Sequence, residues 1–200
     1  MIDGVIKYHV VHTHAQAPSF SAYLQLEALR SRLFALGLIG ETVDGIGYGN
    51  ISQREGEYDF YITATQTGKQ SSLIADEYVW IERYDFESFT VFSKGLNKPS
   101  SEALSHAMIY EVHPDIQAVI HIHSKPLWQM MINTGALATT AEYGTAEMVH
   151  EIAELYQSHD PFKNNTFVMK GHEDGIIAFG KDIAQAEEVL YQMIQSCLQR

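Results

Sequence analysis

The chain has 200 residues, of which 46% are hydrophobic and 19% charged, and this composition suits one globular domain with a sizeable core. Its formal net charge of −12 argues against nucleic acid and anionic membranes as partners. Its one cysteine, Cys197, excludes an internal disulfide and fits a reducing compartment. We expect residues 1–200 to form a single domain, with residues 1–20 as an N-terminal extension strand.

The first 14 residues read as a strand in which Tyr8, Val10, His12 and His14 share one face. His12 and His14 form a His-x-His pair. We interpret them as surface or subunit-contact histidines, with metal ligands as the alternative, because no carboxylate lies near them in sequence.

The N-terminal region lacks the pattern of a signal peptide, and no apolar run approaches the ~20 residues of a membrane span. We therefore expect a cytoplasmic protein.

An apolar stripe at helical spacing predicts a helix that begins near Pro18 and ends at a C-cap at Gly37. The glycine-rich stretch GETVDGIGYGN follows. It is not a G-x-G-x-x-G fingerprint at a strand–helix junction, so we do not infer dinucleotide binding. Asn50, directly after Gly49, is a candidate pocket residue, and a turn asparagine is the alternative.

Alternating apolar residues predict strands at 58–63, 78–84 and 89–92. The loop ATQTGKQ follows the first of them. Its residues Thr65, Thr67 and Gly68 offer hydroxyls and a backbone N–H that suit an anion such as a phosphate. By itself, this composition does not establish an anion site.

The sequence PSSE at 99–102 predicts the start of a helix that runs to about Val112, with Ser100 or Ser101 as its N-cap. Glu102 would fall in the first turn, where the helix dipole favours an ionised carboxylate. Taken alone, Glu102 reads as an acid that stabilises the helix.

The stretch AVIHIHS at 118–124 reads as a short buried strand with His121 and His123 on one face. Their Cβ atoms would lie roughly 7 Å apart, so that both imidazoles can reach one metal ion at about 2.0–2.1 Å. The alternative is two polar residues on the solvent face of an edge strand.

The C-terminal half is predicted to contain helices at 126–135, 145–158 and 181–198 and strands at 166–169 and 176–179. His172 falls in the turn between those strands, and its alternative is a turn residue that bonds a backbone carbonyl. Three histidines with Glu102 can form a catalytic metal site, because three neutral nitrogens leave zinc an open position. A cupin also uses such residues, but its Glu follows the histidine pair, and strand–helix alternation does not suit an all-β barrel.

Together these motifs resemble the class II aldolase/adducin family, whose prototypes are the fuculose- and rhamnulose-phosphate aldolases. The resemblance covers roughly residues 21–198. It rests on Asn50 in GNISQR, on PSSE, on SHAMIYEVHPD and AVIHIHS, and on His172 ahead of GIIAFG.

The resemblance implies an α/β fold, a three-layer α/β/α sandwich with a mostly antiparallel central sheet. It implies that Glu102 is the catalytic acid/base and that Tyr143 is a proton donor. The implied ligands of a divalent metal, usually Zn²⁺ with Mn²⁺, Co²⁺ or Fe²⁺ as alternatives, are His121, His123 and His172. The residues implied to bind the phosphate or enediolate end of the substrate are Gly49, Asn50, Thr67, Gly68, Ser100 and Ser101. Family members are typically homotetramers with sites at subunit boundaries.

The implied reaction is reversible retro-aldol cleavage of a small hydroxy-ketone through an enediolate, with a sugar phosphate as the expected substrate. The alternatives are decarboxylation, dehydration or 4-epimerisation at the same metal site. A non-catalytic adducin-like scaffold is disfavoured, because this chain keeps all the metal histidines.

Two departures from the family pattern put the phosphosugar in doubt. His172 is followed by Glu173 and Asp174 before Gly175, and the loop reads Thr-Gln-Thr-Gly. The two acids could tune the metal or block an anionic substrate.

Overall fold

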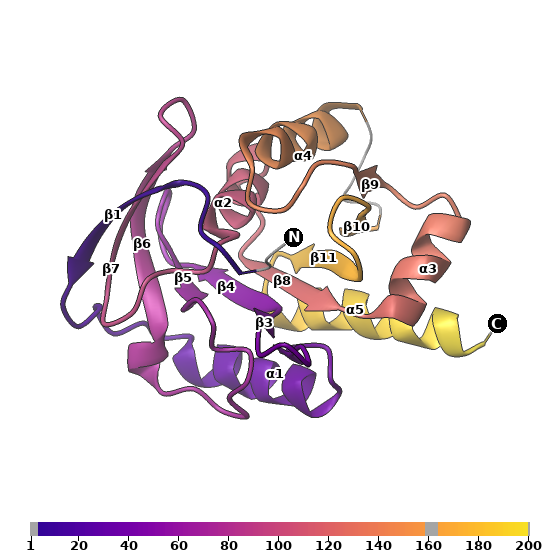
Figure 1. Ribbon diagram of the computed structural model, residues 1–200, viewed down its shortest axis with the longest axis horizontal. Coiled ribbons are helices and arrows are strands. Elements are labelled where there is room, and N and C mark those ends of the chain that lie inside the picture. The colour runs from indigo at the N-terminus through magenta and orange to yellow at the C-terminus, as the bar shows by residue number, and fades with distance from the viewer. Residues whose placement is uncertain (1–3, 159–163, 200) are drawn as a thin grey trace.

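The computed structural model describes residues 4–158 and 164–199, which form a nine-stranded sheet with helices on both faces (Figure 1). The strand order is β1-β7-β6-β5-β4-β8-β11-β10-β9. The strands are β1 (His9–His14), β4 (Asn50–Arg54), β5 (Phe60–Thr63), β6 (Tyr78–Asp85), β7 (Thr90–Gly95), β8 (Ala118–His123), β9 (Ala138–Thr139), β10 (Thr166–Met169) and β11 (Gly175–Gly180). A separate hairpin pairs β2 (Gly40–Glu41) with β3 (Gly47–Tyr48).

The predicted α/β sandwich is confirmed, with a sheet that is mixed rather than purely antiparallel. The outer pairs β1–β7 and β9–β10 are parallel, and the pairs between them are antiparallel. β2, β3, β4 and β9 were not predicted. Two-residue strands such as β2, β3 and β9 are too short for an alternating pattern to show, and β4 directly follows the glycine-rich stretch.

The helices cover the two faces of the sheet unequally (Figure 1). They are α1 (Tyr23–Ala35), α2 (Ala103–Val112), α3 (Lys125–Asn133), α4 (Ala146–Ser158) and α5 (Ile183–Leu198), with a short 3₁₀ helix, η1 (Ala75–Glu77). α2 and α4 pack on one face, and α1, α3 and α5 on the other. Along β8, Val119 packs in the α2/α4 core, and Ile120 and Ile122 pack in the opposite core. His121 and His123 alternate with these isoleucines, so they face the α2/α4 side.

The boundaries of α1 show how local sequence sets the ends of a helix. α1 ends at Ala35 with Leu36 as its C-cap, one residue before the predicted Gly37, which follows with a φ of +71°, while the N–H of Leu38 bonds the carbonyl of Leu33 at 2.9 Å. Its start differs from the prediction, because the helix begins at Tyr23 rather than near Pro18.

The start of α2 corrects the predicted N-cap. The helix begins at Ala103, and Glu102 occupies the N-cap position without a side-chain cap hydrogen bond. The hydroxyl of Ser100 instead accepts the N–H of Glu102 at 3.3 Å, in the turn ahead of the helix. Glu102 therefore lies just before the helix rather than inside its first turn.

Residues 1–3 of the predicted N-terminal strand lie outside the described residues. Within the described residues the strand is shorter than predicted, since β1 begins at His9 and lies parallel to β7 at the edge of the sheet. Residues 4–8 precede it and form no strand.

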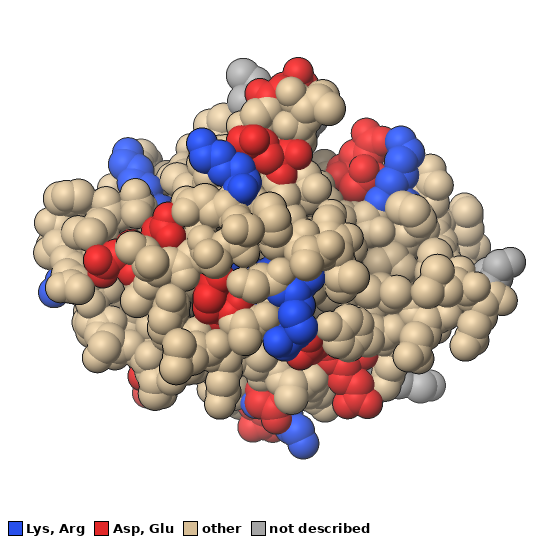
Figure 2. Space-filling view, turned by 90° about the horizontal axis from the view of Figure 1, so that it is seen from below, with Lys and Arg blue, Asp and Glu red and all other residues tan. Residues whose placement is uncertain are grey.

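The face formed by α1 and α5 carries mixed charge. Arg32 of α1 pairs with Glu187 of α5 at 2.7 Å. Figure 2 shows basic side chains spread singly over this face, most of them beside acidic ones. This face therefore offers no continuous basic surface. Within the described residues, no helix is both long enough and apolar enough to cross a membrane.

Candidate metal centre and active site

β8 places its histidine pair in the interior of the sheet. The strand is bonded to β4 on one side and to β11 on the other, with His121 opposite both Asn50 and Ile177. His121 is fully buried and His123 is partly buried. The edge-strand alternative is therefore wrong for this pair.

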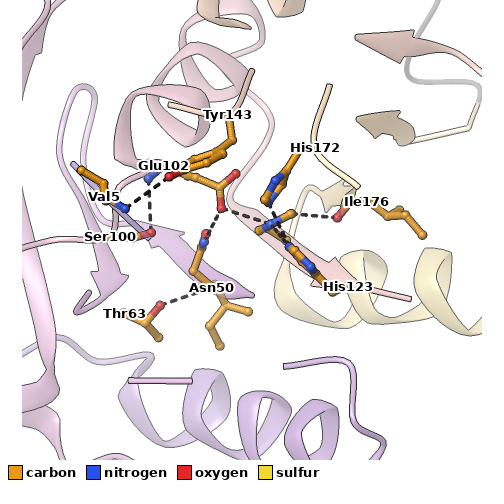
Figure 3. Close-up of polar contacts among 11 residues, drawn as sticks. Val5, Asn50, Thr63, Ser100, Glu102, His123, Tyr143, His172 and Ile176 are labelled. Atoms are coloured by element: carbon orange, nitrogen blue, oxygen red, sulfur yellow. Dashed lines mark hydrogen bonds and ion pairs between the residues drawn. The ribbon is translucent and has the colours of Figure 1, made fainter. Parts of the chain in front are cut away.

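The turn between β10 and β11 brings in the third histidine (Figure 3). The Nε2 atom of His123 lies 2.9 Å from Nε2 of His172 and 3.2 Å from Nε2 of His121. The ligand atoms of all three lie within 4.8 Å of one another, so the group could hold a metal ion. Nitrogens about 2.0–2.1 Å from a tetrahedral ion lie roughly 3.3 Å apart, which agrees with the two short distances.

The turn that carries His172 depends on a close approach at Gly175. A Cβ atom on Gly175 would lie 2.7 Å from Cδ2 of His172 and 3.2 Å from Cε1 of His121. Only a residue without a side chain lets both rings converge here. The N–H of Gly175 also bonds the carbonyl of His172 at 3.0 Å, which closes the turn.

The electrostatics of the site favour a neutral imidazole at His123. Burial lowers the pKa of His123 well below its ordinary value, and the neighbouring rings of His121 and His172 lower it further. Nδ1 of His121 lies 3.2 Å from the carbonyl oxygen of Ile176. An Nδ1–H donated to that carbonyl leaves the Nε2 lone pair directed at the centre, the arrangement that metal-binding histidines use.

A buried carboxylate lies beside the histidines. Oε2 of Glu102 is 3.1 Å from Nε2 of His121, and Glu102 is only 4% exposed. Asn50 donates its Nδ2–H to the same Oε2 at 2.7 Å (Figure 3). Asn50 is the first residue of β4 and points into the site, so the turn-asparagine alternative is wrong. Gly49 before it has a φ of +76°, a conformation that glycine adopts readily.

All the residues predicted to bind substrate line one cleft. The histidine triad and Glu102 line the same cleft as Gly49, Asn50, Thr67, Gly68, Ser100 and Ser101. The structure thus brings together segments that are far apart in sequence, while their individual binding roles stay predictions. The hydroxyl of Thr67 already donates its hydrogen to the carbonyl of Ala64 at 2.8 Å. In this structure that hydrogen is therefore not available to an anion in the cleft.

Tyr143 packs beside His172 and is not part of the described lining of the cleft. Its ring centroid is 4.8 Å from that of His172, and it is 1% exposed. Its hydroxyl accepts the backbone N–H of Val5 at 3.3 Å. Its role as proton donor stays a prediction.

Sequence reasoning missed two supporting side chains. Tyr48 stacks on the ring of His123 with centroids 5.1 Å apart. Arg30 is 1% exposed and donates to the carbonyls of Thr67 and Gln70 at 2.9 and 2.6 Å, which fixes the TQTG loop. Arg30 falls among the buried residues of α1. A charged residue on the apolar face of a predicted helix was the sequence signal that could have marked it as a buried supporting side chain.

The two acidic residues after His172 differ in position. The side chain of Glu173 is 72% exposed and pairs with Lys125 at 3.4 Å, so it lies at the surface and outside the described cleft lining. Asp174 has a φ of +66°, and its carbonyl accepts the N–H of Ser124 at 2.9 Å. Asp174 therefore shapes the turn.

With this geometry in view, comparison with known proteins gives the family. Residues 37–200 match the family described as "Class II Aldolase and Adducin N-terminal domain". The chain belongs to this family. It is 28% identical over 166 residues to an L-fuculose phosphate aldolase of Methanococcus maripaludis, a match that covers 74% of this chain and 82% of the relative.

Solved structures agree on the fold. An L-fuculose 1-phosphate aldolase superposes with a TM-score of 0.65 at 21% identity, covering 91% of this chain and 85% of that one. YgbL of Escherichia coli superposes with a TM-score of 0.68 at 16% identity, covering 90% and 87%, and its description leaves aldolase, epimerase and decarboxylase open. The expectation of an aldolase-like enzyme is confirmed at the level of relatives that are named as aldolases.

Proposed function

We propose that this protein is a metal-dependent aldolase that reversibly cleaves a small hydroxy-ketone, with a sugar phosphate as substrate. The observation that carries the proposal is the convergence of three imidazole Nε2 atoms on one point, with the Glu102 carboxylate 3.1 Å from His121. Family membership supports it, as does the name of the curated relative.

The side chains present fit a divalent cation, and we propose Zn²⁺ held by His121, His123 and His172. Three nitrogen ligands with room for a further ligand are typical of catalytic zinc, while imidazole also suits Mn²⁺, Co²⁺ or Fe²⁺ less selectively. An ion bound there would act as a Lewis acid that polarises the ketol oxygens and stabilises the negative charge left by cleavage.

Glu102 is the residue that we assign to proton transfer. In the cleavage direction it takes the proton from the hydroxyl of the departing carbon, the C–C bond breaks, and an aldehyde leaves. The same carboxyl then returns the proton to the carbon of the remaining fragment, so that one group serves as base and acid. The hydrogen bond from Asn50 to Oε2 holds the carboxylate in place for both steps.

We place the phosphate of the substrate in the part of the cleft away from the three histidines. Backbone groups of Gly49, Thr67 and Gly68 and the hydroxyls of Ser100 and Ser101 line this part of the cleft, a composition suited to an oxyanion. We also propose a homotetramer in the cytoplasm, which rests on the family resemblance. Light scattering on the purified protein tests the assembly.

Metal analysis followed by an aldol assay tests the function. The metal-loaded protein is incubated with dihydroxyacetone phosphate and short aldehydes, and both C–C bond formation and aldehyde release are measured. We expect turnover that Glu102→Gln abolishes while the metal is retained. Turnover that is unchanged in Glu102→Gln would contradict the role of Glu102.

The second candidate is another reaction at the same metal site, which the description of the structurally similar YgbL keeps open. Decarboxylation, dehydration and 4-epimerisation all polarise the same kind of oxygen pair. Release of carbon dioxide, loss of water or isomerisation of a sugar phosphate, without aldehyde, would favour this candidate over an aldolase.

A further inference from the structure

The N-terminal arm, defined here as residues 4–8, lies beside the active site although it falls outside the family match at 37–200. In Figure 1 the indigo segment ahead of β1 runs from the sheet edge, where β1 lies, towards the middle of the sheet near β8. Gly4 is itself part of the cleft lining. The arm therefore reaches the site before the chain enters the sheet.

Lys7 makes three contacts with one short segment. Its Nζ donates to the carbonyl of Tyr143 at 2.8 Å, pairs with the carboxylate of Glu142 at 2.6 Å, and lies 3.8 Å from the centroid of the Tyr143 ring. The side chain of Lys7 is 24% exposed, so these contacts are partly shielded from water. Together they hold the backbone and the ring of Tyr143 at once.

Other arm residues contact two further segments of the site. The hydroxyl of Tyr8, which is buried, donates to the carbonyl of Ser100 at 2.6 Å. The carbonyl of Gly4 accepts Nε2 of Gln66 at 3.4 Å. Gln66 also accepts the N–H of Gly47 at 3.0 Å, which connects the arm to the glycine-rich side of the cleft.

We propose that the N-terminal arm is a working part of this active site, in which Gly4 closes one end of the substrate cleft and Lys7 is a positioning residue for Tyr143. In Figure 3, Glu102 lies between Val5 on one side and His123 and His172 on the other, so the arm faces the site across from the metal ligands. The Tyr143 ring packs on His172. By fixing Tyr143, Lys7 therefore also helps to fix the ring of a proposed metal ligand. This inference rests on the proposed function.

The first test compares Lys7→Met with Lys7→Arg, and uses Lys181→Met, an exposed lysine ahead of α5, as the matched control. We expect Lys7→Met to lower kcat by about 10- to 100-fold, because a shift of the Tyr143 ring would misplace the ring of His172 that packs on it. KM, metal content and Tm should stay near those of the unaltered protein. Lys7→Arg should recover most of the activity, and Lys181→Met should lose none. A wild-type kcat in Lys7→Met would overturn the proposal.

A second measurement does not depend on activity. Hydrogen–deuterium exchange should rise in Lys7→Met at residues 141–145 and remain unchanged there in Lys181→Met. Unchanged exchange in both variants overturns the arm's role. If the unaltered protein shows no aldol turnover and the exchange still rises, the aldolase proposal fails while the arm inference stands.

A backbone variant covers the case in which Lys7→Met does not fold. Val5→Pro removes the N–H that donates to the Tyr143 hydroxyl, and Val5→Ala keeps it. We expect kcat to fall in Val5→Pro and not in Val5→Ala. Equal kcat values in the two variants would contradict the proposal.

Discussion

Two strands of this molecule carry the same His-x-His spacing, and only one of them builds a site. β8 lies inside the sheet, with β4 and β11 on its two sides, and a turn supplies His172 as a third imidazole. β1 lies at the edge against β7 alone, and Nδ1 of His12 contacts the hydroxyl of Ser93 at 3.0 Å. Among the described residues, the histidine group that could hold a metal contains the β8 pair and not the β1 pair. Spacing makes two imidazoles able to converge, while position in the sheet and a third ligand decide whether they do.

The largest effect should come from exchanging the ligands themselves. We expect His172→Ala to lose bound metal and to lower turnover by more than about 100-fold, since changing even an outer partner of a ligand costs about 10- to 100-fold. The matched control is His12→Ala together with His14→Ala. Elemental analysis and the aldol assay compare them, and metal loss in the β1 variants would remove the distinction between the two pairs.

Glu102 sharpens the comparison, because among the described residues an acidic side chain pairs with a histidine of β8 and none pairs with a histidine of β1. We expect Glu102→Gln to lower turnover by about 10²- to 10⁴-fold, the usual range for a general acid–base group. Metal content should stay at the wild-type level. If metal is lost together with activity, Glu102 acts as a ligand rather than as the base.

Glycines opposite the two pairs offer a third comparison. Gly175 pairs with His123 and Gly95 pairs with His14. A Cβ on Gly175 would lie 2.7 Å from the His172 ring, whereas a Cβ on Gly95 meets its nearest atom at 3.3 Å. We expect Gly175→Ala to weaken metal affinity by about tenfold, by displacing a ligand ring. Gly95→Ala should bind metal as the unaltered protein does. Competition with a chromophoric chelator measures both.

The last expected effect is on stability rather than on activity or metal binding, and it is a pH dependence from His106, a buried neighbour of the β8 site. Burial lowers the pKa of His106 to about 3, and His121 contributes to this direction. Below pH 6.5 His106 is protonated in the unfolded chain but stays neutral in the folded chain. The free energy of unfolding therefore falls as the pH falls from 6.5 towards 3. At pH 5 the loss is about 2 kcal/mol.

Urea unfolding of the metal-free protein at pH 7 and pH 5 measures this loss. His106→Gln should lose less stability than the unaltered protein over that range, and the exposed variant His14→Gln should behave as the unaltered protein does. A His106→Gln variant with the full wild-type pH dependence would contradict the assignment to His106.

Much of the fold and the gathering of the site followed from patterns that act locally. The alternation in β8, the turn at His172 and the PSSE entry to α2 are each determined within a few residues, so they could be predicted. The N-cap was wrong because the Ser100 hydroxyl serves the turn before the helix. The length of the N-terminal strand was wrong because residues 4–8 follow contacts with distant segments rather than a strand pattern.

Other features could not be found from the sequence because they depend on what the fold brings close. Arg30 and Thr67 are 37 positions apart, and Lys7 and Tyr143 are 136 positions apart. The parallel pairing of β1 with β7 is equally non-local. A side chain that supports a site from a distant element leaves no periodic trace in its own surroundings.

The interior position of β8 has a consequence for how this protein would respond to a chelator. Because the strand is bonded to β4 along Ala118–His121 and to β11 along its whole length, and is packed in two cores, we expect its histidines to be held by the sheet rather than by an ion. Removal of the metal by a chelator should therefore abolish activity without unfolding the protein, and adding the cation back should restore activity. The metal-free protein would therefore stay folded when the cation is scarce and become active again when the cation is available.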